Sequence, residues 1–345
     1  MSEIVKVLFT SAGRRVELLQ AFKKAFSELD IQGEIIATDI NPLAPSLYFS
    51  DKVYIVPPST DPKYPYVLQN IALKEKIDLI FPLTDLDISI LANIKQELQR
   101  YGIRAVVVDK QIAEMTSDKL LTYKFFKDIG VPTPASWTPS EVLEQTNIDF
   151  PLFIKPRFGS ASKQTFKVNN RQQLEFFAQY IDKPIIQEFL PGPEVTTDVV
   201  CDFGGNVLGV VSRQRLEVRA GEVSKGKTIY DPLIIKYASL IACSMNAIGP
   251  ITIQSIYKDK KPFFTEINAR FGGGAPLGFA AGVDAPKWLL ALAAGLFPDI
   301  PPIGEYRKNL FMVRYDKSLF LTEANIKEDK DIEEEINNEI GSNNF

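Results

Sequence analysis

The chain has 345 residues, of which 45% are hydrophobic and 24% charged, so it is a globular protein with enough residues for two or three domains. Its net charge of −4 argues against general nucleic-acid binding, which needs concentrated positive charge, and we expect no nucleic-acid partner. The sequence contains no histidine, which excludes Ser–His–Asp catalysis, Cys–His catalysis and histidine-ligated zinc. Any chemistry must therefore use carboxylates, lysines, arginines, amides, the backbone or a bound metal ion, as phosphoryl transfer does.

The two cysteines, Cys201 and Cys243, lack the spacing of a metal site or a disulfide framework. The sequence shows no signal peptide and no apolar run near the ~18 residues that span a membrane. We therefore expect a cytoplasmic protein that has no membrane partner.

The first part of the chain is predicted to form a parallel sheet. Short apolar runs alternate there with helical spacing of apolar residues, which is typical of a doubly wound α/β domain. The predicted strands cover 4–10, 34–39, 53–56, 79–82 and 104–108, and the predicted helices cover 16–29, 66–75 and 87–101. Residues 1–112 are therefore predicted to be a Rossmann-like domain.

The first turn of this domain does not carry a dinucleotide fingerprint. Residues 10–14 hold one glycine, Gly13, where the fingerprint needs three, and we expect neither NAD nor FAD. Ligands of open α/β sheets bind at the carboxyl ends of the strands. We interpret the strand ends at Ser11–Arg14, Asp39 and Thr84–Asp87 as the border of a small-molecule cleft.

A lysine follows the predicted connector over 109–116. Ser117 and Asp118 suit the N-cap of a helix over 120–129, so Lys119 lies in the first helical turn. The helix dipole does not stabilise a lysine in the first turn of a helix. Lys119 is therefore either a functional residue or an ordinary lysine exposed to solvent.

A second lysine, Lys155, ends a predicted strand over 150–156. A Gly/Ser loop and a strand over 165–168 follow it, which together form a hairpin. The loop lacks the Walker A pattern, but its tip could fold over phosphates. A hairpin tip with a lysine that reaches solvent is the alternative.

The remaining elements are predicted from their apolar runs. They are helices over 171–180, 231–245 and 284–294, and strands over 184–190, 195–201, 207–213 and 311–314. The polar stretch over 213–228 is interpreted either as a substrate-facing loop or as an exposed excursion. The acidic, Asn-rich tail over 323–345 is predicted to be disordered.

The strongest candidate for a site is a hairpin over 251–270. Its strands, 251–257 and 263–270, flank a lysine-rich turn, and strand alternation places Glu266, Asn268 and Arg270 on one face. A turn centred on Lys260 sets Gln254 directly opposite Glu266. Such oxygen donors suit Mg²⁺ together with substrate phosphates, and an arginine beyond them suits a phosphate or carboxylate.

The other face of this hairpin and the segment after it complete the prediction. The other face is expected to pack on the core through Phe263, Thr265, Ile267 and Ala269. The glycine run Gly272–Gly274 allows close approach of backbone N–H groups to an anion. Taken alone, a solvated hairpin face followed by a flexible loop would show the same pattern.

These motifs, in this order, resemble the ATP-grasp superfamily. They are a lysine after Ser-Asp, FIKP with Lys155, a Ser/Gly loop, QEFLPGPE, and Gln254 with TEINAR. The resemblance covers residues 1 to about 320 and is nearest to a short branch of carboxylate–amine ligases similar to the large subunit of carbamoyl phosphate synthase. It implies a Rossmann-like pre-ATP-grasp domain followed by a two-lobed α+β ATP-grasp domain, with a small lobe over 113–190 and a large lobe over 191–322.

The resemblance also implies roles for single residues. Lys119 and Lys155 would contact the ATP phosphates, and Ser160 and Ser162 would belong to the loop that closes over them. Gln187, Glu188 and the Leu190 backbone would contact adenine, and Glu194 would contact the ribose. The metal ligands would be Gln254, Glu266 and Asn268, the transferred phosphate or acyl phosphate would meet Arg270, and the acceptor would meet Gly272, Gly273 and Gly274. Arg213 is a candidate substrate residue, because the arginines over 213–227 suggest an anionic substrate.

The sequence departs from the family pattern in two positions. Gln254 stands where many members have an acidic residue, and Gln187 stands where glutamate is commoner. A second ATP-grasp half and a glutaminase partner are missing from the sequence, so carbamoyl phosphate synthesis is not expected.

The resemblance implies an ATP-dependent ligase that uses Mg²⁺, with Mn²⁺ as a substitute. It would activate a small-molecule carboxylate as an acyl phosphate and join it to an amine, and a homodimer is the base-rate expectation. Two alternatives stay open at this point: a small-molecule kinase with an alcohol acceptor, and a nucleotide-binding protein without catalysis.

Overall fold

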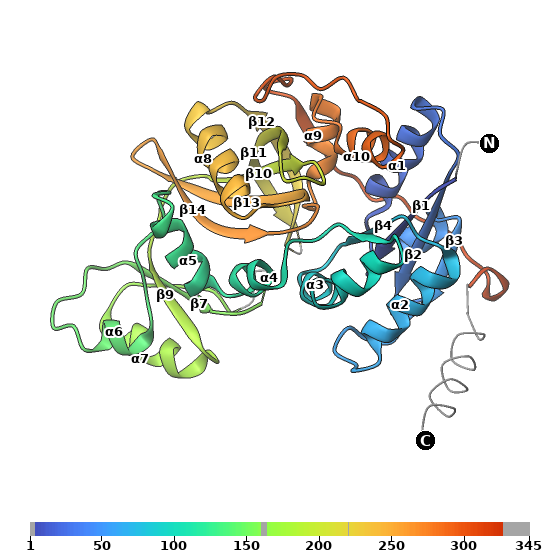
Figure 1. Cartoon of the computed structure of the whole chain (residues 1–345). Helices are drawn as coiled ribbons and strands as arrows, with labels where there is room; N and C mark the ends of the chain where they lie inside the picture. The colour runs from blue at the N-terminus through green and yellow to red at the C-terminus, as the bar shows by residue number, and fades with distance from the viewer. Residues whose placement is uncertain (1–3, 160–163, 220, 327–345) are drawn as a thin grey trace. The chain divides into compact units, whose positions relative to one another are not determined.

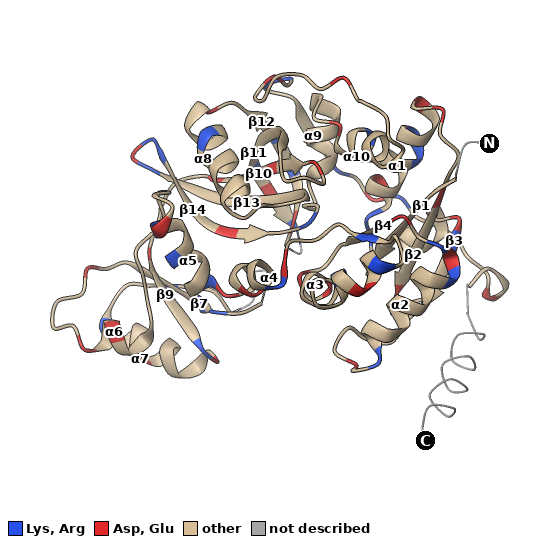
Figure 2. Cartoon of the chain, in the orientation of Figure 1, with Lys and Arg blue, Asp and Glu red and all other residues tan. Residues whose placement is uncertain are grey.

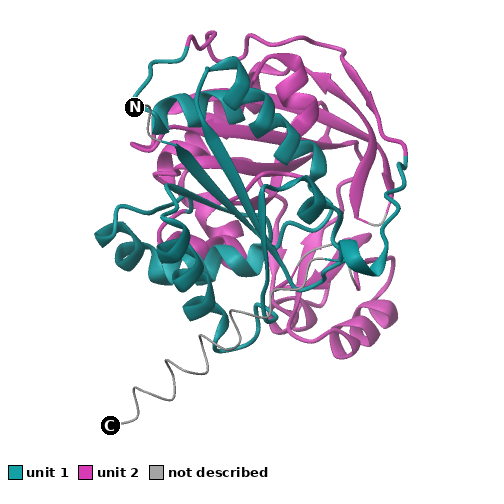
Figure 3. Cartoon of the chain, turned by 90° about the vertical axis from the view of Figure 1, so that its right-hand side faces the viewer, with its two compact units in different colours: residues 1–107, 286–298, 316–345 teal, residues 108–285, 299–315 magenta. Residues whose placement is uncertain are grey.

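The computed structural model describes residues 4–159, 164–219 and 221–326. The chain divides into two compact units (Figure 3), one formed by 1–107, 286–298 and 316–345 and the other by 108–285 and 299–315. They are called unit 1 and unit 2 below, and each is described by itself. The tail over 323–345 was predicted to be disordered. Its residues 323–325 form a short 3₁₀ helix, η2, and residues 327–345 lie outside the described residues.

Unit 1 is built on a parallel sheet with the strand order β3-β2-β1-β4-β5. This order confirms the predicted doubly wound fold. The strands are β1 Val5–Thr10, β2 Gly33–Asp39, β3 Lys52–Ile55, β4 Leu79–Pro82 and β5 Arg104–Ala105. The predicted strand over 104–108 is therefore shorter than expected.

Aromatic rings pack in the core of unit 1. Helices accompany its sheet (Figure 1). They are α1 Val16–Glu28, η1 Pro45–Phe49, α2 Tyr64–Glu75, α3 Asp85–Arg100 and α10 Ala285–Ala293, whose first residue belongs to unit 2. The rings of Phe9 and Phe22 meet edge to face with centroids 4.9 Å apart, and Phe81 stacks on Phe9 at 5.6 Å. Such ring pairs add to the stability that burial of apolar area provides.

The carboxyl ends of these strands carry a hydrogen-bonded cluster. Buried Asp87 accepts hydrogen bonds from the Thr10 hydroxyl (2.8 Å) and the Tyr64 hydroxyl (3.0 Å). Burial raises the pKa of the Asp87 carboxyl, and the hydrogen bonds oppose that rise. Asp39 accepts from the Gly13 N–H at 2.7 Å. The predicted cleft residues thus hold one another in place, and a cleft at these ends stays a prediction.

The first part of unit 2 is a small antiparallel sheet with the order β6-β9-β7-β8 and the helices beside it. The elements are α4 Lys110–Ser117, α5 Lys119–Asp128, β6 Ser136–Trp137, α6 Pro139–Leu143, β7 Leu152–Pro156, β8 Phe166–Val168, α7 Arg171–Tyr180 and β9 Pro184–Glu188. The core of this sheet is apolar and includes Ile154, Leu174 and Ile186, all fully buried.

The second part of unit 2 is a larger antiparallel sheet with the order β14-β13-β10-β11-β12-β15. Its strands and helices are β10 Glu194–Cys201, β11 Val207–Arg219, β12 Glu222–Ile229, α8 Pro232–Ser244, β13 Gly249–Lys258, β14 Lys261–Asn268, α9 Ala275–Ala281 and β15 Phe311–Val313. Helix α8 packs against β10 and β11, and α9 packs against β11 and β12 (Figure 1).

Short elements such as η1, β6 and α6 were not predicted, and three longer stretches also differ from the sequence-based expectation. The predicted connector over 109–116 is mostly helix α4, whose single buried side chain is Ala113, so its apolar pattern is weak. The stretch over 213–228 is not a loop, because β11 and β12 pair through it, and its outer residues 216–219 are exposed. Helix α9, which follows the glycine run, was not predicted at all.

No helix among the described residues is long and apolar enough to cross a bilayer.

Candidate active site

The hairpin β13–β14 has the predicted pairing at its site end, although its turn is not centred on Lys260. The turn pairs Lys258 with Lys261, and the extra residue Thr265 then brings Gln254 opposite Glu266. Gln254 pairs with Glu266 and Thr252 pairs with Asn268. Asp259 and Lys260 form the turn with positive φ angles of 49° and 62°, which fits a tight two-residue connection. The register therefore places the Gln254 amide directly across from the Glu266 carboxylate.

A bulge alters one face of this hairpin. Ser255 pairs with Phe264, so Thr265 is an extra residue in β14 and the alternation changes there. Phe264 is fully buried and packs against Phe126, with ring centroids 6.2 Å apart. The expectation that Phe263 and Thr265 face the core is therefore wrong, whereas Ile267 and Ala269 are buried as expected.

Lys155 and Glu266 meet in the structure although 111 positions separate them. The Lys155 Nζ donates to Glu266 Oε1 at 3.0 Å, and the Lys155 side chain is 7% exposed. Burial opposes ionisation of Glu266, but the charges of Lys155 and Lys119 outweigh it and hold the pKa of that carboxyl below its usual value. Glu266 is therefore an anion at neutral pH, surrounded by the two lysines predicted to contact phosphates.

Lys119 is fixed at the start of α5 by backbone and side-chain contacts. Its N–H donates to the Arg157 carbonyl at 3.1 Å, and its Nζ donates to the Gly159 carbonyl at 2.6 Å. Asp118 caps the helix by accepting from the Leu120 N–H at 2.9 Å, as predicted. Lys119 thus lies beside the start of the loop after β7. Ser160 and Ser162 of that loop lie outside the described residues.

The same cap ties α5 to the end of β7. Arg157 donates to both Asp118 oxygens, from Nε at 2.7 Å and from Nη2 at 2.5 Å. Burial raises the pKa of Asp118, but the Arg157 hydrogen bonds and the two backbone N–H groups outweigh it and lower the pKa. This fork sets the distance between the two lysine-bearing elements.

Replacing Asp118 with asparagine tests the fork through its pH dependence. Asparagine keeps the cap but removes the charge, so we expect unit 2 to lose about 1–3 kcal/mol at pH 7. A lowered folded-state pKa stabilises only above the unfolded pKa of about 4, and the contribution disappears as pH falls through the folded value. Urea unfolding at pH 7 and at about pH 3 should show the difference shrinking. A difference that is the same at both pH values would contradict this account.

The predicted adenine and ribose residues lie on β9 and at the start of β10. The buried Gln187 side chain donates to the Ser136 hydroxyl at 2.7 Å, so its amide nitrogen already has a partner. Lys258 donates to Glu188, and Arg215 donates to Glu194. The Leu190 side chain is buried. Basic and acidic residues are interspersed along unit 2 (Figure 2), and each predicted nucleotide-site carboxylate carries a cationic partner.

The residues after β14 lie close to a buried ion pair. Arg270 is half-buried and donates to the Phe271 carbonyl at 3.3 Å. Arg213 is 3% exposed, and its guanidinium forms an ion pair with Asp198. This predicted substrate residue therefore already has a protein partner. Gly272 and Gly274 lie against the Arg213 guanidinium.

The oxygen donors of the hairpin fit Mg²⁺ better than a softer metal. Glu266, Asn268 and Gln254 offer one carboxylate and two amides, and such a set is completed by phosphate oxygens and water. Over 4–159, 164–219 and 221–326 no three Asp, Glu or Cys side chains gather in a group that could hold a metal ion without such help. The residues therefore suit a metal that arrives with a nucleotide.

Sequence patterns missed the partners of the predicted site residues. Lys258 and Arg215 were not singled out, although each binds a predicted nucleotide-site carboxylate. Asp198 and Thr252 were missed as well, because they lie on neighbouring strands that only the sheet order brings together. The one available signal was a charged residue inside a predicted strand, since Asp198 directly precedes the apolar residues Val199 and Val200 of β10.

Two family models match this chain. A model described as "ATP-grasp domain" matches residues 116–274, and one described as "PylC-like, N-terminal domain" matches residues 7–107. Residues 116–274 of this chain are an ATP-grasp domain. The ATP-grasp match spans the small sheet of unit 2 and the larger sheet except β15, and it ends at Gly274, the last residue of the predicted site. The predicted resemblance and fold class are confirmed.

Two curated relatives are similar in sequence to this ATP-grasp chain. The carbamoyl-phosphate synthase of Methanobrevibacter smithii is 25% identical over 283 residues, which are 76% of the chain and 75% of the relative. The carbamoyl phosphate synthase large chain of Thermoplasma acidophilum is 27% identical over 274 residues, which are 71% of the chain. The chain spans only 25% of that second relative's length.

Solved structures share the fold of this ATP-grasp chain. The biotin carboxylase domain dimer of Hydrogenobacter thermophilus 2-oxoglutarate carboxylase, in complex with MgADP, ADP and bicarbonate, has a TM-score of 0.68 at 21% identity and covers 89% of this chain and 73% of its own. An L-amino acid ligase from Bacillus licheniformis has a TM-score of 0.65 at 17% identity, with 84% and 74% covered. These likenesses concern the fold.

Proposed function

We propose that this protein is an ATP-dependent ligase that activates a substrate carboxylate as an acyl phosphate and joins it to an amine, with release of ADP and phosphate. The observation that carries the proposal is the contact between Lys155 and Glu266, with Gln254 opposite Glu266. This contact brings together a lysine that can bind phosphates and oxygen donors that can bind a metal ion. The carboxylate–amine ligases and carbamoyl-phosphate synthases among the related proteins support the same chemistry.

In the first step the residues of unit 2 hold ATP. Lys119 and Lys155 contact its phosphates, Gln187, Glu188 and the Leu190 backbone contact adenine, and Glu194 contacts the ribose. Ser160 and Ser162 would cover the phosphates. When bound, Mg²⁺ supplies charge neutralisation at the phosphates, with Gln254, Glu266 and Asn268 as its protein ligands, and Mn²⁺ suits the same oxygen donors.

ATP entry requires the Lys155–Glu266 ion pair to exchange partners. Lys155 exchanges Glu266 for a phosphate oxygen, and Glu266 exchanges the lysine for a bound metal ion, so neither charge is left unpaired. Adenine and ribose are neutral donors, so they share Glu188 and Glu194 with Lys258 and Arg215 without displacing these cations.

In the chemical steps a carboxylate oxygen attacks the γ-phosphorus, and the bond to the bridging oxygen breaks so that ADP leaves with the electron pair. Lys155 and Arg270 neutralise charge that develops on the transferred group. The amine then attacks the acyl carbon, phosphate leaves, and the amine loses a proton. The backbone of Gly272, Gly273 and Gly274 faces the acyl phosphate and the acceptor. No protein nucleophile is required, which fits a chain without histidine.

A hydroxylamine trap tests the reaction type. The protein is incubated with Mg-ATP, one member of a panel of amino acids and small carboxylates, and hydroxylamine. We expect the carboxylate that stimulates ADP release also to give a hydroxamate, because hydroxylamine captures an acyl phosphate. ADP release with a phosphate ester and no hydroxamate would instead identify a kinase.

The substrates are small molecules, and their identity can be screened in the same way. A carboxylate that binds the folded protein raises its melting temperature in the presence of Mg-ADP. The homodimer that we expect is tested by light scattering with and without Mg-ADP.

A further inference from the structure

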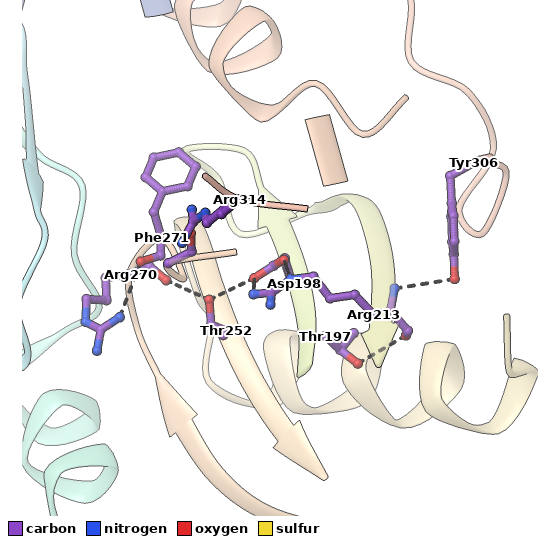
Figure 4. Close-up of polar contacts among 10 residues, drawn as sticks. Thr197, Asp198, Arg213, Thr252, Arg270, Phe271, Tyr306 and Arg314 are labelled. Atoms are coloured by element: carbon purple, nitrogen blue, oxygen red, sulfur yellow. Dashed lines mark hydrogen bonds and ion pairs between the residues drawn. The ribbon is translucent and has the colours of Figure 1, made fainter. Parts of the chain in front are cut away.

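Arg213 is the most completely surrounded arginine near the predicted site. Its Nε donates to Asp198 Oδ2 at 2.7 Å and its Nη2 donates to Asp198 Oδ1 at 3.1 Å, and both residues are buried (Figure 4). A two-pronged pair of this kind fixes the plane of the guanidinium. Breaking it would leave a buried charge without its partner, so its geometry is strongly maintained.

Thr252 extends this pair to the backbone of the site. Its hydroxyl oxygen lies 3.0 Å from Asp198 Oδ1 and 3.0 Å from the Arg270 carbonyl oxygen (Figure 4). The hydroxyl has a single proton, which the two acceptors share. The carboxylate on β10 is thereby linked to the carbonyl of the arginine that we assign to the transferred phosphoryl group.

The glycine run rests directly on the guanidinium. A Cβ at Gly274 would lie 2.3 Å from Arg213 Nη1 and 2.7 Å from its Cζ. A Cβ at Gly272 would lie 2.8 Å from Arg213 Nη2. Neither position has room for a side chain, so the two glycines are required by the packing of the backbone on Arg213.

A second arginine holds the run from another strand. Arg314, which follows β15, donates from Nη2 to the Gly273 carbonyl at 2.5 Å and from Nη1 to the Val223 carbonyl at 3.3 Å. The central peptide of the run is therefore anchored to β12 while its flanking glycines contact Arg213.

We propose that Arg213 is a positioning residue: held by Asp198, its guanidinium sets the backbone of Gly272–Gly274 for the transferred phosphoryl group. This inference rests on the proposed function, because the proposed reaction is what brings a phosphoryl group to Gly272–Gly274. It differs from the sequence-based prediction that Arg213 touches the substrate. Arg213 acts through the glycines, and the phosphoryl group meets the backbone and Arg270.

Arg213→Lys is the first test, because lysine keeps the charge but loses the flat two-pronged guanidinium. The probes are Mg-ADP alone and Mg-ADP with aluminium fluoride, which occupies the place of the transferring phosphoryl group. Calorimetry should show Mg-ADP affinity within about twofold of the unmodified protein. The gain in affinity from aluminium fluoride should fall by about 10-fold or more, because small displacements of a positioned group are costly.

Hydrogen exchange of the peptide over 270–277 gives a second readout that needs no ligand. We expect faster exchange in Arg213→Lys than in the unmodified protein, because the backbone has lost its support. Loss of the aluminium fluoride gain with unchanged exchange would mean that Arg213 touches the phosphoryl group itself, which would overturn the proposal. If the unmodified protein shows no gain, the proposed function fails, and exchange alone decides whether Arg213 supports the segment.

Two further variants separate positioning from a general loss of structure. Gly274→Ala keeps the guanidinium and displaces the segment, so it should lose the aluminium fluoride gain, whereas Gly204→Ala in the distant β10–β11 turn should keep it. If aluminium fluoride increases the Mg-ADP affinity of Gly274→Ala as much as that of the unmodified protein, the proposal is contradicted. If Arg213→Lys does not fold, the double variant Asp198→Asn/Arg213→Gln leaves no unpaired buried charge and should show the same loss.

Discussion

Replacing Glu266 with glutamine is expected to lower ATP turnover on the order of 10³-fold, the largest effect of any single change in the chain. Glu266 is the one carboxylate that the hairpin face offers to a metal, and it sits between Lys155 and Gln254. Charge stabilisation by a bound metal contributes several kcal/mol to phosphoryl transfer, and its loss accounts for a change of this size. ADP release measured with saturating Mg-ATP checks the prediction.

The matched control is Glu217→Gln. Glu217 also accepts a hydrogen bond from a lysine, Lys225, at 2.7 Å, but both side chains are about half exposed. An exposed pair of this kind contributes little, so the control should keep its turnover. Equal turnover in the two variants would remove Glu266 from the proposed site.

Lys155→Met is expected to lower turnover by about 10²–10³-fold, because a preorganised cation aimed at the phosphates is lost. The change also acts on Glu266. Lys155 is the leading cause that lowers the pKa of that carboxyl, so its removal raises the pKa. The acidic limb of the residual pH–rate profile should therefore move to higher pH, because Glu266 must be ionised to serve as a ligand.

Lys167→Met serves as the control for Lys155. Lys167 lies on the neighbouring strand β8, where its Nζ sits 4.4 Å from the ring centroid of Phe189 and makes no contact with Glu266 among the hydrogen bonds described. Turnover and pH profile should stay unchanged in this variant. Lys155→Arg, which keeps a cation, should recover part of the activity. A Lys155→Met profile with an unmoved acidic limb would contradict the coupling to Glu266.

The sequence allowed most elements of both units to be predicted, because their signals are local. The parallel sheet followed from alternating apolar runs. The pairing of Gln254 with Glu266 was predicted from a turn centred on Lys260, but the two-residue turn and the bulge together produce it. The bulge at Thr265 could not be predicted, because Phe263 and Phe264 are both apolar and either could face the core. Strands β11 and β12 were missed between 213 and 228, because residues 216–219 of β11 are all exposed and show no buried face, and this end of the strand is held by pairing with β12.

The candidate site was predictable as a set of residues and not as a set of contacts. Lys155 and Glu266 were named from separate motifs, but only the fold brings their charges together across 111 positions. Asp198 and Thr252 carry no motif, and their link to Arg213 depends on the order β13-β10-β11. The cation paired with each nucleotide-site carboxylate is likewise a property of strand packing.

A calorimetric titration of Mg-ATP into the full chain tests the central claim most directly. We expect one binding site per chain, with an affinity for ATP that falls when EDTA removes the metal and falls again in Glu266→Gln. Absence of binding heat for a protein shown to be folded, or equal affinity with and without Mg²⁺, would contradict a metal–phosphate platform on the β13–β14 hairpin.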